Sequence, residues 1–114
     1  MPNQPVVVQE PTSGPTPDAG RVSSQTVLHT PEVRVVEIAF GSGGELTEHS
    51  APVPILVQAM EGTVAFELSG TTYRLDAPGF VYLPTAGERH RVVADGPARI
   101  QITMLLGQAA PAGT

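Results

Sequence analysis

The sequence predicts a single all-β domain of the sandwich or barrel type. Short segments rich in Val, Ile, Phe and Tyr alternate with turn-forming Gly, Pro, Ser and Asp along most of the chain. No segment carries a long apolar pattern at helical spacing. Short strands separated by frequent turn signals are typical of β-sandwiches and barrels.

The length of 114 residues fits one domain. The folded domain is expected to span residues 25–107. Residues 1–24 are rich in Pro, Gly, Ser and Thr, which predicts a disordered tail. Residues 108–114 are rich in Ala, Pro and Gly and are expected to form a second flexible tail. The valines at 6–8 are the exception within the first tail, since they could pair as an edge strand on a partner subunit.

Eight segments have the character of strands. They are residues 26–29, 33–40, 54–60, 63–68, 71–75, 80–83, about 89–94, and 98–106. The segment 54–60 is almost continuously apolar, which favours a strand buried on both faces. The segment 63–68 alternates instead, with Val64, Phe66 and Leu68 on one face.

Turn residues divide these segments. Gly41, Gly43 and Gly44 interrupt the chain after residue 40. Ser69-Gly70 and Asp95-Gly96 are dipeptides typical of two-residue hairpin turns. Both pairs therefore predict hairpins.

Composition excludes several classes of partner. The chain has no cysteine, so disulfides and thiolate metal sites are ruled out. The formal net charge is −5 with only six Lys and Arg, which argues against binding of nucleic acid or an anionic membrane. There is no apolar run of membrane-spanning length, and the first residues lack the basic region of a signal peptide. We therefore expect a cytoplasmic protein with no membrane partner.

Two histidines stand at informative spacings. Gly43 is followed by five residues and His49, then by Ala51, Ile55 and, six residues later, Gly62. The first motif of the cupin family reads Gly, five residues, His, one residue, His, three or four residues, Glu, six residues, Gly. The chain resembles that motif, with Ala51 and Ile55 in place of the second His and the Glu.

A second motif follows in the expected order. The family pattern reads Gly, five residues, Pro, one residue, Gly, two residues, His. Gly79, Gly87 and His90 fit this spacing, and the proline is displaced by one residue to Pro84. The chain is therefore similar to small single-domain cupins over about residues 26–106. The resemblance implies a double-stranded β-helix, that is, a jelly-roll barrel.

The resemblance also implies a metal site with two of its four usual ligands. His49 and His90 occupy ligand positions and would meet at one end of the barrel. A divalent metal there (zinc, nickel, iron, copper or manganese) is expected to be weakly bound, because two imidazoles are fewer donors than a catalytic metal usually has. Glu45 shares strand parity with His49 and is the candidate for a third ligand if residues 45–49 are extended. The alternative, which we favour, is a solvated loop carboxylate. Alternatively, the two imidazoles hydrogen-bond a ligand, a water or each other.

Three functions stay open from the sequence. The first is a protein that binds a small-molecule ligand, with a degenerate two-His metal site. The second is a metal-dependent enzyme of the dioxygenase or isomerase kind. The third is a non-catalytic sensory or structural module. A homodimer is expected in each case, because a small barrel with exposed strand edges needs them covered.

Overall fold

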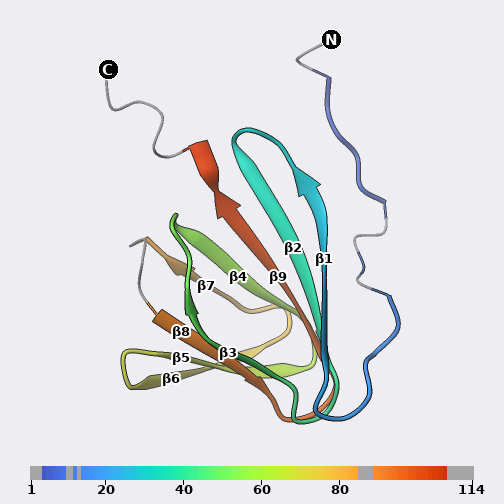
Figure 1. Cartoon of the computed structure of the whole chain (residues 1–114), viewed down its shortest axis with the longest axis vertical. Helices are drawn as coiled ribbons and strands as arrows, with labels where there is room; N and C mark the ends of the chain where they lie inside the picture. The colour runs from blue at the N-terminus through green and yellow to red at the C-terminus, as the bar shows by residue number, and fades with distance from the viewer. Residues whose placement is uncertain (1–3, 10–11, 13, 85–88, 108–114) are drawn as a thin grey trace.

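A computed structural model describes residues 4–9, 12, 14–84 and 89–107, with the backbone alone at residues 48 and 49. The part of the chain described forms nine β-strands and contains no α-helix. The strands, shown in Figure 1, are β1 (Val22–His29), β2 (Val33–Phe40), β3 (Glu45–Ser50), β4 (Ile55–Glu61), β5 (Thr63–Leu68), β6 (Thr71–Asp76), β7 (Phe80–Leu83), β8 (Arg89–Ala94) and β9 (Ala98–Leu105). The all-β prediction is confirmed.

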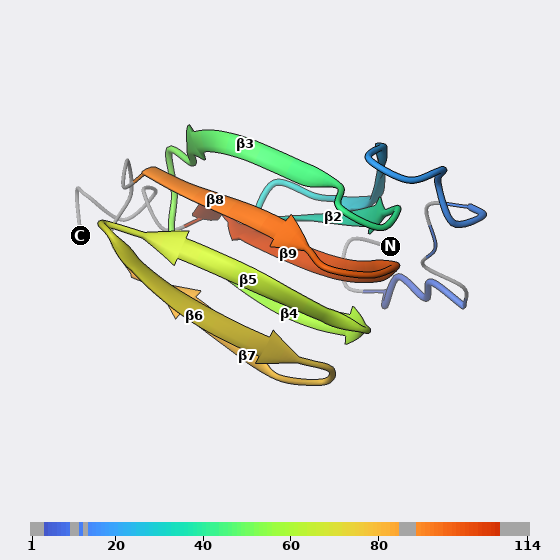
Figure 2. The ribbon, with the colours of Figure 1, turned by 90° about the horizontal axis from the view of Figure 1, so that it is seen from below.

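The strands form two antiparallel sheets that pack face to face (Figure 2). One sheet has five strands in the order β1-β2-β9-β4-β7, and the other has four in the order β3-β8-β5-β6. The chain crosses between the sheets at several turns, so strands adjacent in sequence often belong to different sheets. Crossing of this kind produces the jelly-roll arrangement.

One of the two expected hairpins forms and the other does not. Ser69 and Gly70 both adopt positive φ, 50° and 81°, and join the paired strands β5 and β6. This is the geometry of a primed two-residue turn. Asp95-Gly96 instead connects β8 to β9, which lie in different sheets, so the hairpin predicted there is wrong. Each of these strands already has two neighbours in its own sheet, which leaves no free edge for a local hairpin.

The core lies between the sheets and consists of inward-facing aliphatic and aromatic side chains. Along β4, Ile55, Val57 and Ala59 are all 2 % exposed or less. The alternate residues are half-buried, and Met60 is 41 % exposed, so the expectation of a strand buried on both faces is wrong. Phe66 from β5 and Ile100 from β9 are fully buried against them. The sequence left open which set of residues on β9 faces inward, and the structure selects the set that includes Ile100 and Ile102.

The largest differences from the sequence prediction are an earlier start of β1 and the presence of β3. β1 begins at Val22, inside the segment 1–24 expected to be a tail. Its extra residues pair with the end of β2, as in the register of Val22 with Phe40. β3 was not expected at all, because its sequence Glu-Leu-Thr-Glu-His-Ser is mostly polar. It is an edge strand, where one side and one face meet water.

The residues just before β1 run along the loop that follows β2. Gly20 donates a backbone hydrogen bond to Ser42 (2.7 Å), and Gly41 donates one to Arg21 (2.9 Å). A Cβ at Gly41 would stand 1.9 Å from the Asp18 carbonyl oxygen, so only glycine fits there.

The outer face of the five-stranded sheet carries a buried ion pair. Arg99 Nη1 lies 3.3 Å from Glu37 Oε1, and the two side chains are only 12 % and 6 % exposed. Arg99 also donates hydrogen bonds to the Thr12 hydroxyl (3.2 Å) and the Gly14 carbonyl oxygen. The segment before β1 thus helps to cover this pair. Residues 108–114, expected to be a flexible tail, lie outside the described residues.

Within the described ranges, no helix has the length and apolar character needed to cross a membrane.

Candidate functional site

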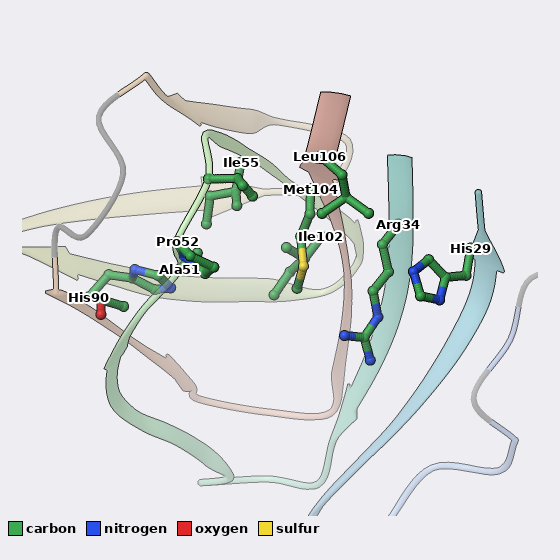
Figure 3. Close-up of a pocket in the computed structure, with 11 residues that line it drawn as sticks. His29, Arg34, Ala51, Pro52, Ile55, His90, Ile102, Met104 and Leu106 are labelled. Carbon is green, nitrogen blue, oxygen red and sulfur yellow. The ribbon is translucent and has the colours of Figure 1, made fainter. Parts of the chain in front are cut away.

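A cavity of about 280 Å³ opens at one end of the sandwich (Figure 3). In Figure 3, His29 and Arg34 stand on one side of it, and His90 with Ala51 and Pro52 on the other. The side chains between these groups are mainly aliphatic. The full lining is His29, Arg34, Ser50, Ala51, Pro52, Val53, Ile55, His90, Ile102, Met104 and Leu106.

The strand register explains why these residues meet. Arg34 pairs with Met104 across β2 and β9, and with His29 across β1 and β2. Residues two apart on a strand share a face, so Arg34 lies on the same inner face as the buried Val36. The ends of β1, β2 and β9 thereby present a cation and an imidazole beside an aliphatic surface.

His90 occupies the opposite wall. It is 1 % exposed, and its ring stacks on Phe66 with a centroid distance of 5.4 Å and an interplanar angle of 20°. Its neighbour on the inner face of β8, Val92, pairs with Phe66. The imidazole is therefore held by the packed core at a position where it also lines the cavity.

The backbone of His49 lies directly opposite His90 in the ladder between β3 and β8. Directly opposite positions of an antiparallel pair lie on one face of the sheet, with Cβ atoms about 4.5–5.5 Å apart. The two positions that the sequence singled out 41 residues apart are thus neighbours across one ladder.

Glu45 does not belong to this group. The pairing of β3 with β8 has a bulge between Leu46 and His49. Leu46 pairs with Val92 and His49 with His90, so three residues along β3 correspond to two along β8. The bulge reverses the alternation on which the third-ligand expectation depended.

Glu45 instead pairs with Val93, on the outer face, and its carboxylate forms an ion pair with Arg91. Arg91 also bonds Glu67 at 2.9 Å. The hydrogen bond from Arg91 holds the pKa of Glu45 below its ordinary value of 4.5. A carboxylate engaged in this way on the outer face is not placed to join His49 and His90.

The other motif positions have clear places. Ala51 and Ile55, which replace the family's remaining ligands, line the cavity with apolar surface. Gln58 lies on the other face of β4 and donates a hydrogen bond to the Pro78 carbonyl oxygen at 2.9 Å. Gly87 of the second motif lies outside the described residues.

The donor set is poor for a tightly held metal. Among the side chains that the structure describes, no three His, Asp or Glu gather in one place. A catalytic zinc usually has three protein ligands, and a non-haem iron site has two His and a carboxylate. A resident catalytic metal beside His90 would therefore need ligands beyond the side chains that the structure describes.

The sequence did not single out Arg34, and it favoured a surface or edge role for His29. His29 is exposed, yet it also lines the cavity mouth. A signal for Arg34 was present: it occupies the same alternation as Val36 and Ile38 in β2, so a charge falls on an apolar face.

Comparison with solved structures identifies the fold. A cupin superfamily protein from Desulfitobacterium hafniense superposes with a TM-score of 0.76 at 16% identity, covering 91% of this chain and 95% of the other. An RmlC-like cupin from Shewanella frigidimarina gives 0.70 at 19% identity, covering 82% and 83%. An uncharacterised conserved protein with a double-stranded β-helix domain from Klebsiella pneumoniae gives 0.71 at 21% identity, covering 82% and 84%.

No protein-family model matches the chain, and no curated protein does. The structural matches nevertheless show that the chain has the cupin fold, the double-stranded β-helix that its motifs predicted.

Proposed function

We propose that this protein binds a small organic molecule in the cavity at the open end of the sandwich. The supporting observation is the lining: an aliphatic wall that includes Ile55, Ile102 and Met104, with Arg34 and His90 at its two sides. Small-molecule sites in proteins are typically concave and mostly apolar, with a few polar groups that fix orientation. At about 280 Å³, this cavity is at the small end of that class.

The donor set supports binding over metal-dependent catalysis. A metal-dependent dioxygenase or isomerase would need a firmly held metal, and the described side chains form no group of three donors. We infer that His49 and His90 take up a divalent ion such as zinc, nickel, iron, copper or manganese only weakly. The same imidazoles can hydrogen-bond a ligand in the cavity instead.

We also infer that the protein forms a homodimer, which is compatible with a binding or a sensory role. Phe80 and Tyr82 project from the edge strand β7 and are 62 % and 49 % exposed. Met60 on the neighbouring β4 is 41 % exposed. These three residues, the outer patch, lie away from the cavity. A second copy is the simplest cover for large apolar side chains beside an unpaired strand edge.

The binding proposal is tested by a fragment screen on ¹⁵N-labelled protein. We expect some fragments to shift the backbone amide signals of Ile102 and Met104. The variant Ala51→Phe should abolish these shifts because the larger side chain fills the cavity. Ala65→Phe, on the outer face of β5, is the matched control and should leave them unchanged. If no fragment shifts these amides in the unaltered protein, the proposal fails.

A further inference from the structure

The environment of Arg34 identifies the kind of molecule that the cavity accepts. Arg34 lies on the inner face of β2, where the next inward residues, Val36 and Ile38, are part of the apolar core. Its Nη2 donates a hydrogen bond to the Thr26 hydroxyl at 3.0 Å. Its Nε is buried and has no hydrogen-bond partner among the described residues.

Arg34 lacks the carboxylate partner that three other arginines of this protein have. Arg91 bonds two carboxylates, Arg99 lies between Glu37 and Glu61, and Arg74 bonds Asp76. Arg34, by contrast, forms no ion pair in the part of the chain described. A buried donor left without a partner costs free energy, and charged groups cost more than neutral ones. A ligand that satisfies this donor would therefore gain affinity from it.

The chemistry of the lining restricts what that ligand is. Among the described residues that line the cavity, Arg34 is the one permanent charge, and none is an Asp or Glu. A guanidinium presents donors in a planar fork that matches a carboxylate in a two-bond geometry. A phosphate carries more charge and is usually bound by several cations or backbone amides. No Lys or second Arg is among the described residues that line the cavity.

The rest of the cavity fits an apolar body of modest size. Ile55, Ile102, Met104 and Leu106 supply the wall between Arg34 and His90. His29, opposite Arg34 on β1, adds a further polar group at the mouth. A molecule with one anionic end and a short hydrocarbon or aromatic portion would match both features.

We propose that the cavity takes a small monocarboxylic acid, with its carboxylate paired to the Arg34 guanidinium and its apolar portion against Ile102 and Met104. This inference rests on the proposed function, namely that the cavity binds a small molecule. It adds the chemical class of the ligand and the residue that selects it.

The experiment compares charged and neutral probes of the same shape. Benzoate and hexanoate are titrated into ¹⁵N-labelled protein beside benzamide and hexanamide, and the Ile102 and Met104 amide shifts give each affinity. We expect each carboxylate to bind about tenfold or more tightly than its amide, the scale of a hydrogen bond to a charged group. Equal affinities would overturn the inference, and so would phenyl phosphate binding more tightly than benzoate.

Variants then assign the preference to Arg34. Arg34→Met keeps the aliphatic stem and should remove the preference for the carboxylate while leaving amide binding within about twofold. Arg34→Lys keeps the charge but not the fork and should retain part of the preference. Arg74→Met, at the exposed arginine on β6, is the matched control and should change nothing. If Arg34→Met still binds the carboxylates more tightly than the amides, Arg34 is not the residue that selects the carboxylate. The cavity would then prefer carboxylates for another reason.

The two proposals can fail separately. If other fragments shift the Ile102 and Met104 amides but the carboxylates show no advantage, the cavity binds a small molecule of another class. If no fragment of any class shifts them, both proposals fail.

Discussion

The imidazole of His90 stacks on the ring of Phe66, with 5.4 Å between the centroids. Both residues are almost completely buried, although one of them also lines the cavity. The cavity wall and the hydrophobic core are therefore continuous at this point, and a change in the core will reach the site.

Phe66→Ala is expected to destabilise the protein by about 3–5 kcal/mol, the range for truncation of a buried phenylalanine. Urea unfolding followed by circular dichroism measures this change. Val93→Ala, on the outer face of the strand that carries His90, should cost about 1 kcal/mol or less. Similar losses from the two substitutions would contradict the described packing.

Metal content should be low and dependent on both histidines. Elemental analysis of purified protein is expected to find a divalent ion below one per chain, removed by EDTA without a change in the circular dichroism spectrum. His49→Ala and His90→Ala should each abolish the uptake, whereas His29→Ala should not. A full equivalent of metal retained against EDTA would show a third protein ligand beside the pair.

Self-association should depend on the outer patch. Sedimentation velocity at micromolar concentration is expected to show a dimer for the unaltered protein. Phe80→Asp should yield a monomer, because it places a charge among apolar side chains. Thr72→Asp, at an exposed position on β6, should leave the dimer intact. A monomer in the unaltered protein would refute the dimer.

The pair Glu37–Arg99 should behave differently from an exposed ion pair. Removing one partner by Glu37→Met should cost about 3–5 kcal/mol, because Arg99 then keeps a buried charge with less compensation. The double variant with Arg99→Met should recover part of that loss. At the exposed Arg74–Asp76 pair, Arg74→Met should cost about 1 kcal/mol or less. The free energy of unfolding in urea distinguishes these cases.

Stability should fall at acid pH partly through Glu45 and Asp76. The hydrogen bond from Arg91 lowers the pKa of Glu45, and the hydrogen bond from Thr63, followed by that from Arg74, lowers the pKa of Asp76. A lowered pKa in the folded state contributes stability that is fully present above the ordinary values of 4.5 and 3.8. That contribution is lost as pH falls through the folded pKa of each group.

Urea unfolding measured between neutral pH and acid pH tests this dependence. Glu45→Gln should flatten the curve below about pH 4.5, and 1 M salt should reduce the difference from the unaltered protein because both groups are near the surface. An unchanged slope in Glu45→Gln would show that Arg91 does not stabilise the ionised carboxylate.

Local pattern was sufficient to predict most strands and the fold. The segments 33–40, 63–68 and 80–83 match the strands β2, β5 and β7 residue for residue. β3 escaped prediction because a polar edge strand lacks the apolar alternation that reveals the others. The hairpin predicted at Asp95-Gly96 is wrong because turn residues specify a bend but not which sheet the next strand joins.

The candidate site was only partly accessible from sequence. Motif spacing selected His49 and His90, whose backbones are paired. Glu45 was misplaced because a bulge is an irregularity that period-two reasoning cannot detect. Arg34 lines the cavity because β2 pairs with β9 in a register that places it opposite Met104. This pairing is a long-range property of the folded chain and could not be predicted from the sequence.

The bulge before His49 also has a consequence for how the gene can change. Removing the codon for Thr47 would restore regular alternation between Leu46 and His49 while keeping both opposite their present partners, Val92 and His90. A one-codon deletion here thus preserves the facing histidine positions. The same deletion between Ile55 and Ala59 would reverse which face the following residues of β4 occupy.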